Sequence, residues 1–192
     1  MSAITISRQL GSLGDELALE VARRLGWQRV CRDLINQAAV KAGVPQVALA
    51  ELDELDFFGL RPTAADWQAY QRQVERFITE LANGGKVVIV GRGGQMVLRG
   101  RPDVLHVRVV APLETRVTRL RQERSISEEA ARACLESSCK ARARYIRRSY
   151  SVDLDDPGLY HLVVNTGLLD LDQAATLLVG ALHNLTGEAA SV

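Results

Sequence analysis

A glycine-rich turn near the amino terminus carries the residues best suited to bind phosphate. The stretch "AITISRQLGSLGDELALEVARRLGW", residues 3–27, predicts a strand, a turn that keeps Gly11, Ser12 and Gly14, and then a helix. Backbone N–H groups of such a turn and the positive end of the helix dipole both attract anions. Phosphate-binding loops are built in this order of strand, turn and helix.

The same turn lacks the lysine that contacts the outer phosphates in loops of the form GxxxxGK[ST]. In one register Arg8 occupies the first glycine position, Leu13 the second, Gly14 the lysine position and Asp15 the hydroxyl position. A shift by one residue puts Asp15 at the lysine position instead. Neither register restores the cation, so Arg8, or an arginine from elsewhere in the chain, is the candidate substitute.

Two acidic residues begin the helix that follows the turn. Asp15 and Glu16 carry carboxylates of the kind that bind Mg²⁺ directly or through water. The alternative is structural, because acids in the first turn of a helix interact favourably with its dipole. In that case their charge opposes phosphate binding unless a cation intervenes.

A second candidate site follows the most hydrophobic strand of the sequence. Arg92 stands between Gly91 and Gly93 directly after the run Val87–Val90. In parallel α/β folds the carboxyl ends of the strands are where ligands bind. Arg92 is therefore a candidate anion ligand, with a structural ion pair as the alternative.

The segment 116–148 is strongly basic, with ten basic residues against four acidic ones and a net charge of +6. Guanidinium groups are suited to phosphoryl transfer, which depends mainly on positioning and charge neutralisation. The alternatives are a solvated helix face or a nonspecific polyanion-binding patch.

Hydrophobic periodicity predicts how these residues are positioned. Short β-rich runs alternate with longer helical patterns, which indicates a mostly parallel sheet with helices on both faces. An aromatic stripe from Trp67 to Leu81 at helical spacing is interpreted as core. An acid-rich stretch over 46–62, with a break at Phe57-Phe58-Gly59, is interpreted as an irregular lobe. Strands are predicted at Ile4–Ser7, Trp27–Cys31, Lys86–Gly91, Leu105–Val110 and His161–Asn165, and helices at about 15–25, 33–42, 67–82, 113–124, 127–149 and 170–185.

Composition places the chain among ordinary globular proteins. The 192 residues are 47% hydrophobic and 24% charged, with a net charge of +1, which implies no global attraction to nucleic acid or an anionic membrane. The three cysteines (Cys31, Cys134 and Cys139) have no CxxC spacing and suggest neither a disulfide framework nor a zinc site. No run is long enough to span a bilayer, and no secretory signal is recognised, so a cytoplasmic location is expected.

The whole chain resembles the cytidylate kinase-like family, a branch of the P-loop nucleoside monophosphate kinases, from about Ile4 to Leu182. The resemblance depends on a set of motifs rather than on the turn alone. They are "ITISRQLGSLGDELA", "CRDLINQAA", "VVIVGRGG", "LHVRVVAPLETRVTRL", "SISEEAA", "KARARYIRRSY" and "DPGLYHLVVNT".

The resemblance implies one three-layer P-loop kinase domain over 1–192, with an acceptor-side helical lobe over 46–82 and a helical lid over about 120–150. It implies ATP bound with Mg²⁺ at Arg8–Glu16, where Asp15 would ligate the metal. A nucleoside monophosphate, CMP or dCMP, would contact Asp33 and Arg92. Arg142 and Arg144 match the lid motif and would act on the transferring phosphoryl group. A homodimer is left open.

Two residues depart from the family pattern. Cys139 stands where the motif usually has Asp before Lys140-Ala141-Arg142, and His161 stands where it usually has Asp in "LYHLV". The first change removes an acid able to orient lid arginines.

Three functions follow from these residues. The leading hypothesis is ATP-dependent phosphoryl transfer to a nucleoside monophosphate. The second is a nucleotide- or anion-binding regulatory module without catalysis, favoured by the missing lysine and by Cys139. The third, a polyanion-binding protein, is disfavoured by the near-neutral total charge.

Overall fold

The computed structural model describes residues 2–43 and 63–187, and within them one five-stranded parallel sheet. The strand order is β2-β3-β1-β4-β5, so β1 lies at the centre with β3 and β4 as neighbours. The sheet confirms the predicted parallel arrangement. The strands are β1 (Ala3–Arg8), β2 (Gln28–Val30), β3 (Val87–Val90), β4 (Val104–Val110) and β5 (Leu162–Asn165).

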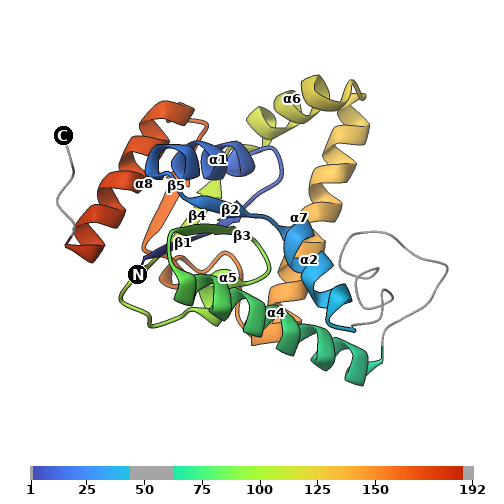
Figure 1. Cartoon of the computed structure of the whole chain (residues 1–192). Coiled ribbons are helices and arrows are strands. Elements are labelled where there is room, and N and C mark those ends of the chain that lie inside the picture. Colours follow the sequence, from blue (N-terminus) through green and yellow to red (C-terminus); the bar gives the residue numbers. More distant parts are fainter. Residues whose placement is uncertain (1, 44–62, 188–192) are drawn as a thin grey trace.

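Helices cover both faces of the sheet and make three layers (Figure 1). Helices α1 (Gly14–Leu25) and α8 (Leu171–Thr186) pack on one face through a cluster that includes Leu17, Val21 and Leu178. The other face is covered by α2 (Arg32–Lys41), α4 (Ala64–Gly84), α5 (Gly94–Val97) and the end of α7 (Glu128–Tyr150).

The hydrophobic pattern accounts for this layering. All four residues of β3 are buried, as expected for a strand with helices on both faces. Helix α4 begins with a capping box between Thr63 and Asp66. Its aromatic stripe is in the core, because Tyr70 and Ile78 are fully buried and Trp67 is 6% exposed.

Helix α6 (Leu113–Arg124) and α7 form a hairpin that projects from the sheet (Figure 1). Ser127 accepts a hydrogen bond from the Ala130 N–H and caps α7. Two short elements were not predicted, α5 and the 3₁₀ turn η1 (Pro157–Leu159), because four and three residues are too short to show a helical period. The predicted irregular segment over 46–62 lies outside the described residues.

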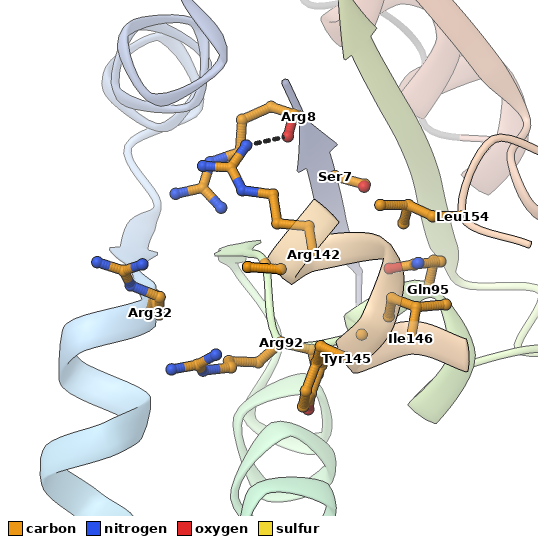
Figure 2. Close-up of a pocket in the computed structure, with 12 residues that line it drawn as sticks. Ser7, Arg8, Arg32, Arg92, Gln95, Arg142, Tyr145, Ile146 and Leu154 are labelled. Carbon is orange, nitrogen blue, oxygen red and sulfur yellow. Dashed lines mark hydrogen bonds between the residues drawn. The ribbon is translucent and has the colours of Figure 1, made fainter. Parts of the chain in front are cut away.

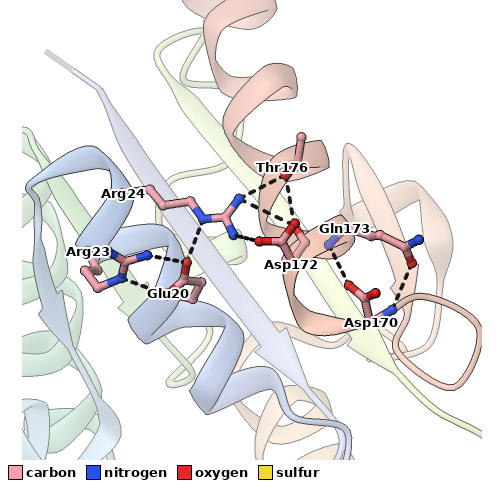
Figure 3. Close-up of polar contacts among 7 residues, drawn as sticks. All are labelled: Glu20, Arg23, Arg24, Asp170, Asp172, Gln173 and Thr176. Carbon is pink, nitrogen blue, oxygen red and sulfur yellow. Dashed lines mark hydrogen bonds and ion pairs between the residues drawn. The ribbon is translucent and has the colours of Figure 1, made fainter.

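A network of arginines joins α1 to α8 at the end far from the glycine-rich turn (Figure 3). Arg24 donates to Glu20 on its own helix at 2.7 Å and to Thr176 on α8 at 2.9 Å. Hydrogen bonds from Arg23, and then from Arg24, lower the pKa of Glu20 to about 2. The network fixes the two helices that support the central strands from one side.

His106 lies in the middle of β4, on the face covered by α5, and is 5% exposed. Its Nδ1 is 2.7 Å from the Thr5 hydroxyl, and its ring stacks on His161 with centroids 5.1 Å apart. Burial first, and then the neighbouring His161, lower the pKa of His106 from 6.5 to about 4. The imidazole is therefore neutral at pH 7.

We expect this histidine to make the fold sensitive to acid. Between pH 6.5 and 4 the unfolded chain binds a proton that folded His106 does not, so stability present above pH 6.5 is lost as the pH falls. The expected loss is about 2 kcal/mol at pH 5. Denaturant unfolding at pH 7 and pH 5 measures it, and His106→Gln should reduce the difference between the two pH values. An equal loss in that variant would assign the acid sensitivity to other groups.

Over the part of the chain that the structure describes, we find no helix with the length and hydrophobicity needed to cross a membrane.

Candidate functional site

The glycine-rich turn connects β1 to α1 and is left-handed at two positions. Gly11 has φ 74° and Leu13 has φ 56°. A leucine in this conformation costs about 1–2 kcal/mol relative to the right-handed region. Leu13 also stands at the helix N-cap, and no side chain caps α1. Among the described residues the first N–H groups of α1 have no side-chain acceptor, which suits them to bind an anion.

Arg8 occupies the space in which a lysine at position 14 would begin. A Cβ on Gly14 would lie 2.4 Å from the Arg8 Cβ and 2.8 Å from its Cγ. The Arg8 side chain then reaches Asp15, with Nε–Oδ2 at 3.0 Å and Nη2–Oδ1 at 3.2 Å. Arg8 is 12% exposed and Asp15 is 47% exposed. A bidentate ion pair therefore replaces the lysine and hydroxyl of the usual loop.

The back of the turn is held by α6 and by the residue after β5. Arg119 donates to the Thr166 carbonyl at 2.7 Å, and the Thr166 hydroxyl donates to the Ser12 carbonyl at 2.7 Å. Ser12 is fully buried, and its hydroxyl donates to the Gln9 carbonyl at 2.8 Å. The predicted Ser12 thus stabilises the turn through its side chain, and Gly11 packs tightly against the Arg116 backbone.

Arg92 is held in a strained turn between β3 and α5. It has φ 51°, between Gly91 and Gly93, which also have positive φ. Strain of this kind in a residue with a side chain is concentrated at functional sites. The Arg92 guanidinium lies 5.5 Å from the Tyr145 ring centroid, and its Nε donates to Asn36 at 3.0 Å. Arg92 is 8% exposed.

Four arginines from four segments line one small cavity, which we call the arginine cavity (Figure 2). Its volume is about 60 Å³, room for a group the size of two waters. None of the described residues that line it is acidic. The arginines are Arg8 at the end of β1, Arg32 at the start of α2, Arg92 and Arg142 of α7.

Arg142 reaches from α7 over the turn and donates to the Arg8 carbonyl (Figure 2). Burial first, and then the charge of Arg8, lower the pKa of Arg142 to about 10. An anion in the arginine cavity would relieve this repulsion between guanidinium groups. The geometry therefore suits the junction of β1, β3 and α7 to an anionic group.

A larger cleft of about 870 Å³ opens beside the turn, and we call it the loop cavity. It is lined by the turn, by Asp15 and Glu16, and by Asp33, whose side chain is 69% exposed. Arg8, Arg32 and Arg142 line both cavities. The predicted acceptor ligands are thus separated, because Asp33 lines the loop cavity and Arg92 lines the arginine cavity.

Most of the basic residues on α6 and α7 lie outside these cavities. Arg144 is exposed and lines neither of them. Arg132 pairs with Glu114 and Glu128, and Lys140 pairs with Glu136. The solvated-face interpretation therefore fits these pairs, whereas Arg119, Arg124 and Arg142 face the loop cavity.

Sequence reasoning missed several residues of the site. Ser7, Arg32 and Thr166 each stand at or just after the carboxyl end of a strand, the same signal that identified Arg92. Arg119 had no comparable signal within its basic helix. Cys139, where the family motif expects Asp, has its sulfur 3.9 Å from Nη1 of the buried Arg116.

The parallel sheet, the loop before α1 and the α6–α7 hairpin define a P-loop kinase fold. Two solved structures share this fold. An uncharacterized protein from Eubacterium ventriosum has a TM-score of 0.76 and 18% sequence identity, and the match covers 95% of this chain and 98% of that one. Shikimate kinase from Bacteroides thetaiotaomicron has a TM-score of 0.57 and 12% sequence identity, and the match covers 95% of this chain and 98% of that one.

The model of the cytidylate kinase-like family matches residues 3–168, and the chain belongs to this family. The cytidylate kinase of Methanocaldococcus jannaschii is 28% identical over 95% of this chain and 98% of that protein. The cytidylate kinase of Pyrococcus horikoshii is 30% identical over 98% of this chain and 93% of that protein. The family resemblance drawn from the motifs is confirmed.

Proposed function

We propose that this protein transfers the γ-phosphoryl group of ATP to a nucleoside monophosphate, with CMP or dCMP as the acceptor. A phosphate oxygen of the acceptor forms a bond to the γ-phosphorus, the bond to the bridging oxygen breaks, and ADP leaves. The acceptor is already an anion, so the reaction needs charge neutralisation and alignment more than a general base.

One observation carries the proposal: four arginines line the arginine cavity, and three of them also line the loop cavity at the uncapped start of α1. The turn and the first N–H groups of α1 would bind the donor phosphates. Arg92 would hold the acceptor phosphate, and Arg142, which lines both cavities, would stabilise the transferring group. Asp33, at the loop cavity, would contact the acceptor outside its phosphate.

The loop cavity has room for ATP, whereas the described residues would supply few ligands to Mg²⁺. The loop cavity has the size of an ordinary nucleotide site. Both Asp15 oxygens accept from Arg8, and the described residues contain no cluster of three metal-ligating side chains. Phosphates and water would thus supply most ligands, with Asp15 adding at most one. Bound Mg²⁺ would neutralise charge on the phosphates.

The alternative function, nucleotide binding without turnover, is favoured by the Arg8–Asp15 pair. The Arg8 side chain of this pair fills the lysine position, and Asp15 would put a carboxylate beside any phosphate bound at the turn. A coupled ADP-release assay over CMP, dCMP, UMP, AMP and GMP, with and without Mg²⁺, separates the two functions. Turnover above the ATP-only rate supports phosphoryl transfer. Calorimetric binding of ATP and a monophosphate without ADP release supports the alternative.

Arg92→Ala should weaken binding of the accepted monophosphate by about 10- to 100-fold, since a charge-assisted hydrogen bond contributes about 1.5–3 kcal/mol. Arg92→Lys should recover only part of the lost affinity, because the lysine ammonium lacks the planar, two-pronged donor geometry of a guanidinium. Calorimetry measures the affinity, with thermal unfolding to confirm that the variants fold. Unchanged affinity for every monophosphate in folded Arg92→Ala would remove Arg92 from the acceptor site.

A further inference from the structure

A buried arginine that the proposed reaction does not use lies near the carboxyl end of β4. Arg108 is 5% exposed and is the register partner of Ser7 on β1. Charged side chains are almost never fully buried unless they are paired. The Arg108 guanidinium donates through Nη2 to Asp155 at 2.6 Å and through Nη1 to the Ser7 hydroxyl at 2.8 Å. The second contact joins this buried charge to the arginine cavity, because Ser7 lines that cavity.

The Ser7 side chain lies on the face of the sheet that carries the arginine cavity. Successive side chains of a strand alternate between its two faces, so Ser7 shares a face with Thr5. Thr5 packs against Gly94 of α5, on the face that the end of α7 also covers. Tyr145 and Ile146 of α7 line the arginine cavity from above this face, and Figure 2 shows Ser7 among the lining residues. The strand therefore positions the Ser7 side chain at the wall of the cavity.

The hydrogen bonds around Ser7 leave its hydroxyl proton available. A serine hydroxyl has one proton to donate and two lone pairs, and one lone pair accepts from Arg108. The Tyr160 hydroxyl donates its own proton to the Leu154 carbonyl at 2.8 Å, and its oxygen is 3.5 Å from Ser7 Oγ, at the limit of a hydrogen bond. Within residues 2–43 and 63–187, no acceptor for the Ser7 proton lies nearer than that oxygen. An oxyanion in the arginine cavity would supply one.

The ion pair of Arg108 leaves part of its positive charge uncompensated. Asp155 follows α7 in a surface loop, where its side chain is 72% exposed, whereas the Arg108 side chain is 6% exposed. Water screens the exposed carboxylate more than it screens the buried guanidinium. The field of Arg108 therefore still acts on the neighbouring cavity. Its hydrogen bond to Ser7 Oγ also polarises the serine O–H and makes it a stronger donor.

We propose that Ser7 is an anion ligand in the arginine cavity, where its hydroxyl donates to a phosphate oxygen, and that Arg108 is its positioning residue. Arg108 fixes the direction of the hydroxyl by accepting no proton from it, and it adds a fifth positive charge behind the four arginines that line the cavity. This role rests on the proposed function, because the phosphate would be that of the acceptor held by Arg92. The binding itself needs no turnover, so it is measured separately.

Two substitutions should change phosphate affinity in opposite directions. Calorimetry measures the Kd of inorganic phosphate and of CMP at pH 7 and constant ionic strength, with chloride as the supporting salt. Ser7→Ala should weaken both by about tenfold or more, the effect of losing a hydrogen bond to a charged group. Asp155→Asn should tighten both by about threefold, because asparagine keeps an oxygen for Arg108 but removes the compensating charge. A purely structural Arg108–Asp155 pair would give unchanged or weaker binding in Asp155→Asn.

The matched control is Asp156→Asn, which removes the same charge from the same loop. Asp156 is exposed and accepts the Gly158 N–H at 2.8 Å, a bond that asparagine can keep, so affinity should change by less than about twofold. The gain from Asp155→Asn should also shrink in a Ser7→Ala background, since Arg108 acts partly through Ser7. Thermal unfolding confirms that each variant folds, and the two loop variants decide the test if Ser7→Ala does not.

Four results would each overturn the proposal. They are no saturable binding of phosphate or CMP to the parent protein, unchanged affinity in folded Ser7→Ala, equal affinity in Asp155→Asn and Asp156→Asn, and an undiminished gain from Asp155→Asn without Ser7. ADP release, measured in parallel, reports on the proposed function independently. The expected binding pattern without ADP release would remove phosphoryl transfer and keep the role of Ser7, whereas ADP release with unchanged binding in Ser7→Ala would do the reverse.

Discussion

Replacing Arg142 by glutamine is expected to lower kcat for phosphoryl transfer by about 10²–10³-fold while leaving the Kd of ATP within a few-fold of the parent value. The range is the cost of removing one preorganised donor from the site where charge develops. Arg142 fits this role because its guanidinium lines both the loop cavity and the arginine cavity. Burial, and then the charge of Arg8, lower the pKa of Arg142, so its guanidinium is partly desolvated and lies near a second positive charge.

The matched controls lie on the same helix. Arg147 is exposed and lines neither cavity, so Arg147→Gln removes the same charge from α7 without touching the site. Its kcat should stay within about twofold of the parent protein. Arg144→Gln tests the other lid arginine, for which we expect a smaller drop than for Arg142, because Arg144 is exposed. Single-turnover rates measure all three variants. Equal kcat in Arg142→Gln and Arg147→Gln would contradict the role of Arg142.

The sheet was predictable from the sequence because each strand has a local signal. The run Val87–Val90 is hydrophobic on both faces, and strands that alternate with helical patterns favour parallel pairing. Arg92 was predictable for the same reason, since its place depends only on where a buried strand ends. Its position between Tyr70 and Tyr145 was not, because those rings come from α4 and α7.

The conformation of the glycine-rich turn could not be predicted from local sequence patterns. The sequence shows that a lysine is missing, but not what fills its place. Arg8 and Asp15 are seven residues apart, and their pairing depends on the left-handed turn at Leu13. A leucine in that conformation contradicts its local preference, so no propensity argument would have placed it there.

The second large effect concerns ATP affinity. We compare a variant that carries four changes with a control that keeps Gly14 and carries the other three. The variant should bind Mg²⁺–ATP about 10- to 100-fold more tightly than the control. The four changes are Arg8→Gly, Leu13→Gly, Gly14→Lys and Asp15→Ser. A charge-assisted hydrogen bond of about 1.5–3 kcal/mol accounts for this range. All four changes are needed. Arg8 blocks position 14, Leu13 is strained at a glycine position, and Asp15 would pair with the new ammonium.

Gly14→Lys alone should fail, and the structure gives the reason. Its Cβ would lie 2.4 Å from the Arg8 Cβ, a carbon near the backbone that cannot swing away as the end of the side chain can. The single variant should therefore lose stability and gain no ATP affinity. Leu13→Gly alone should raise stability by about 1 kcal/mol, because glycine adopts positive φ without strain. That measurement checks the geometry of the turn independently of any nucleotide.

Calorimetry on the four-residue variant and its glycine-14 control then tests the alignment. A gain from the lysine would place the donor phosphates at this turn and show that the parent protein binds them with backbone N–H groups and arginines instead. Equal affinity in the two folded proteins would mean that ATP does not bind at the turn in this register. The Arg8–Asp15 pair would then be a structural element of the turn, and nucleotide binding would have to be sought elsewhere along the loop cavity.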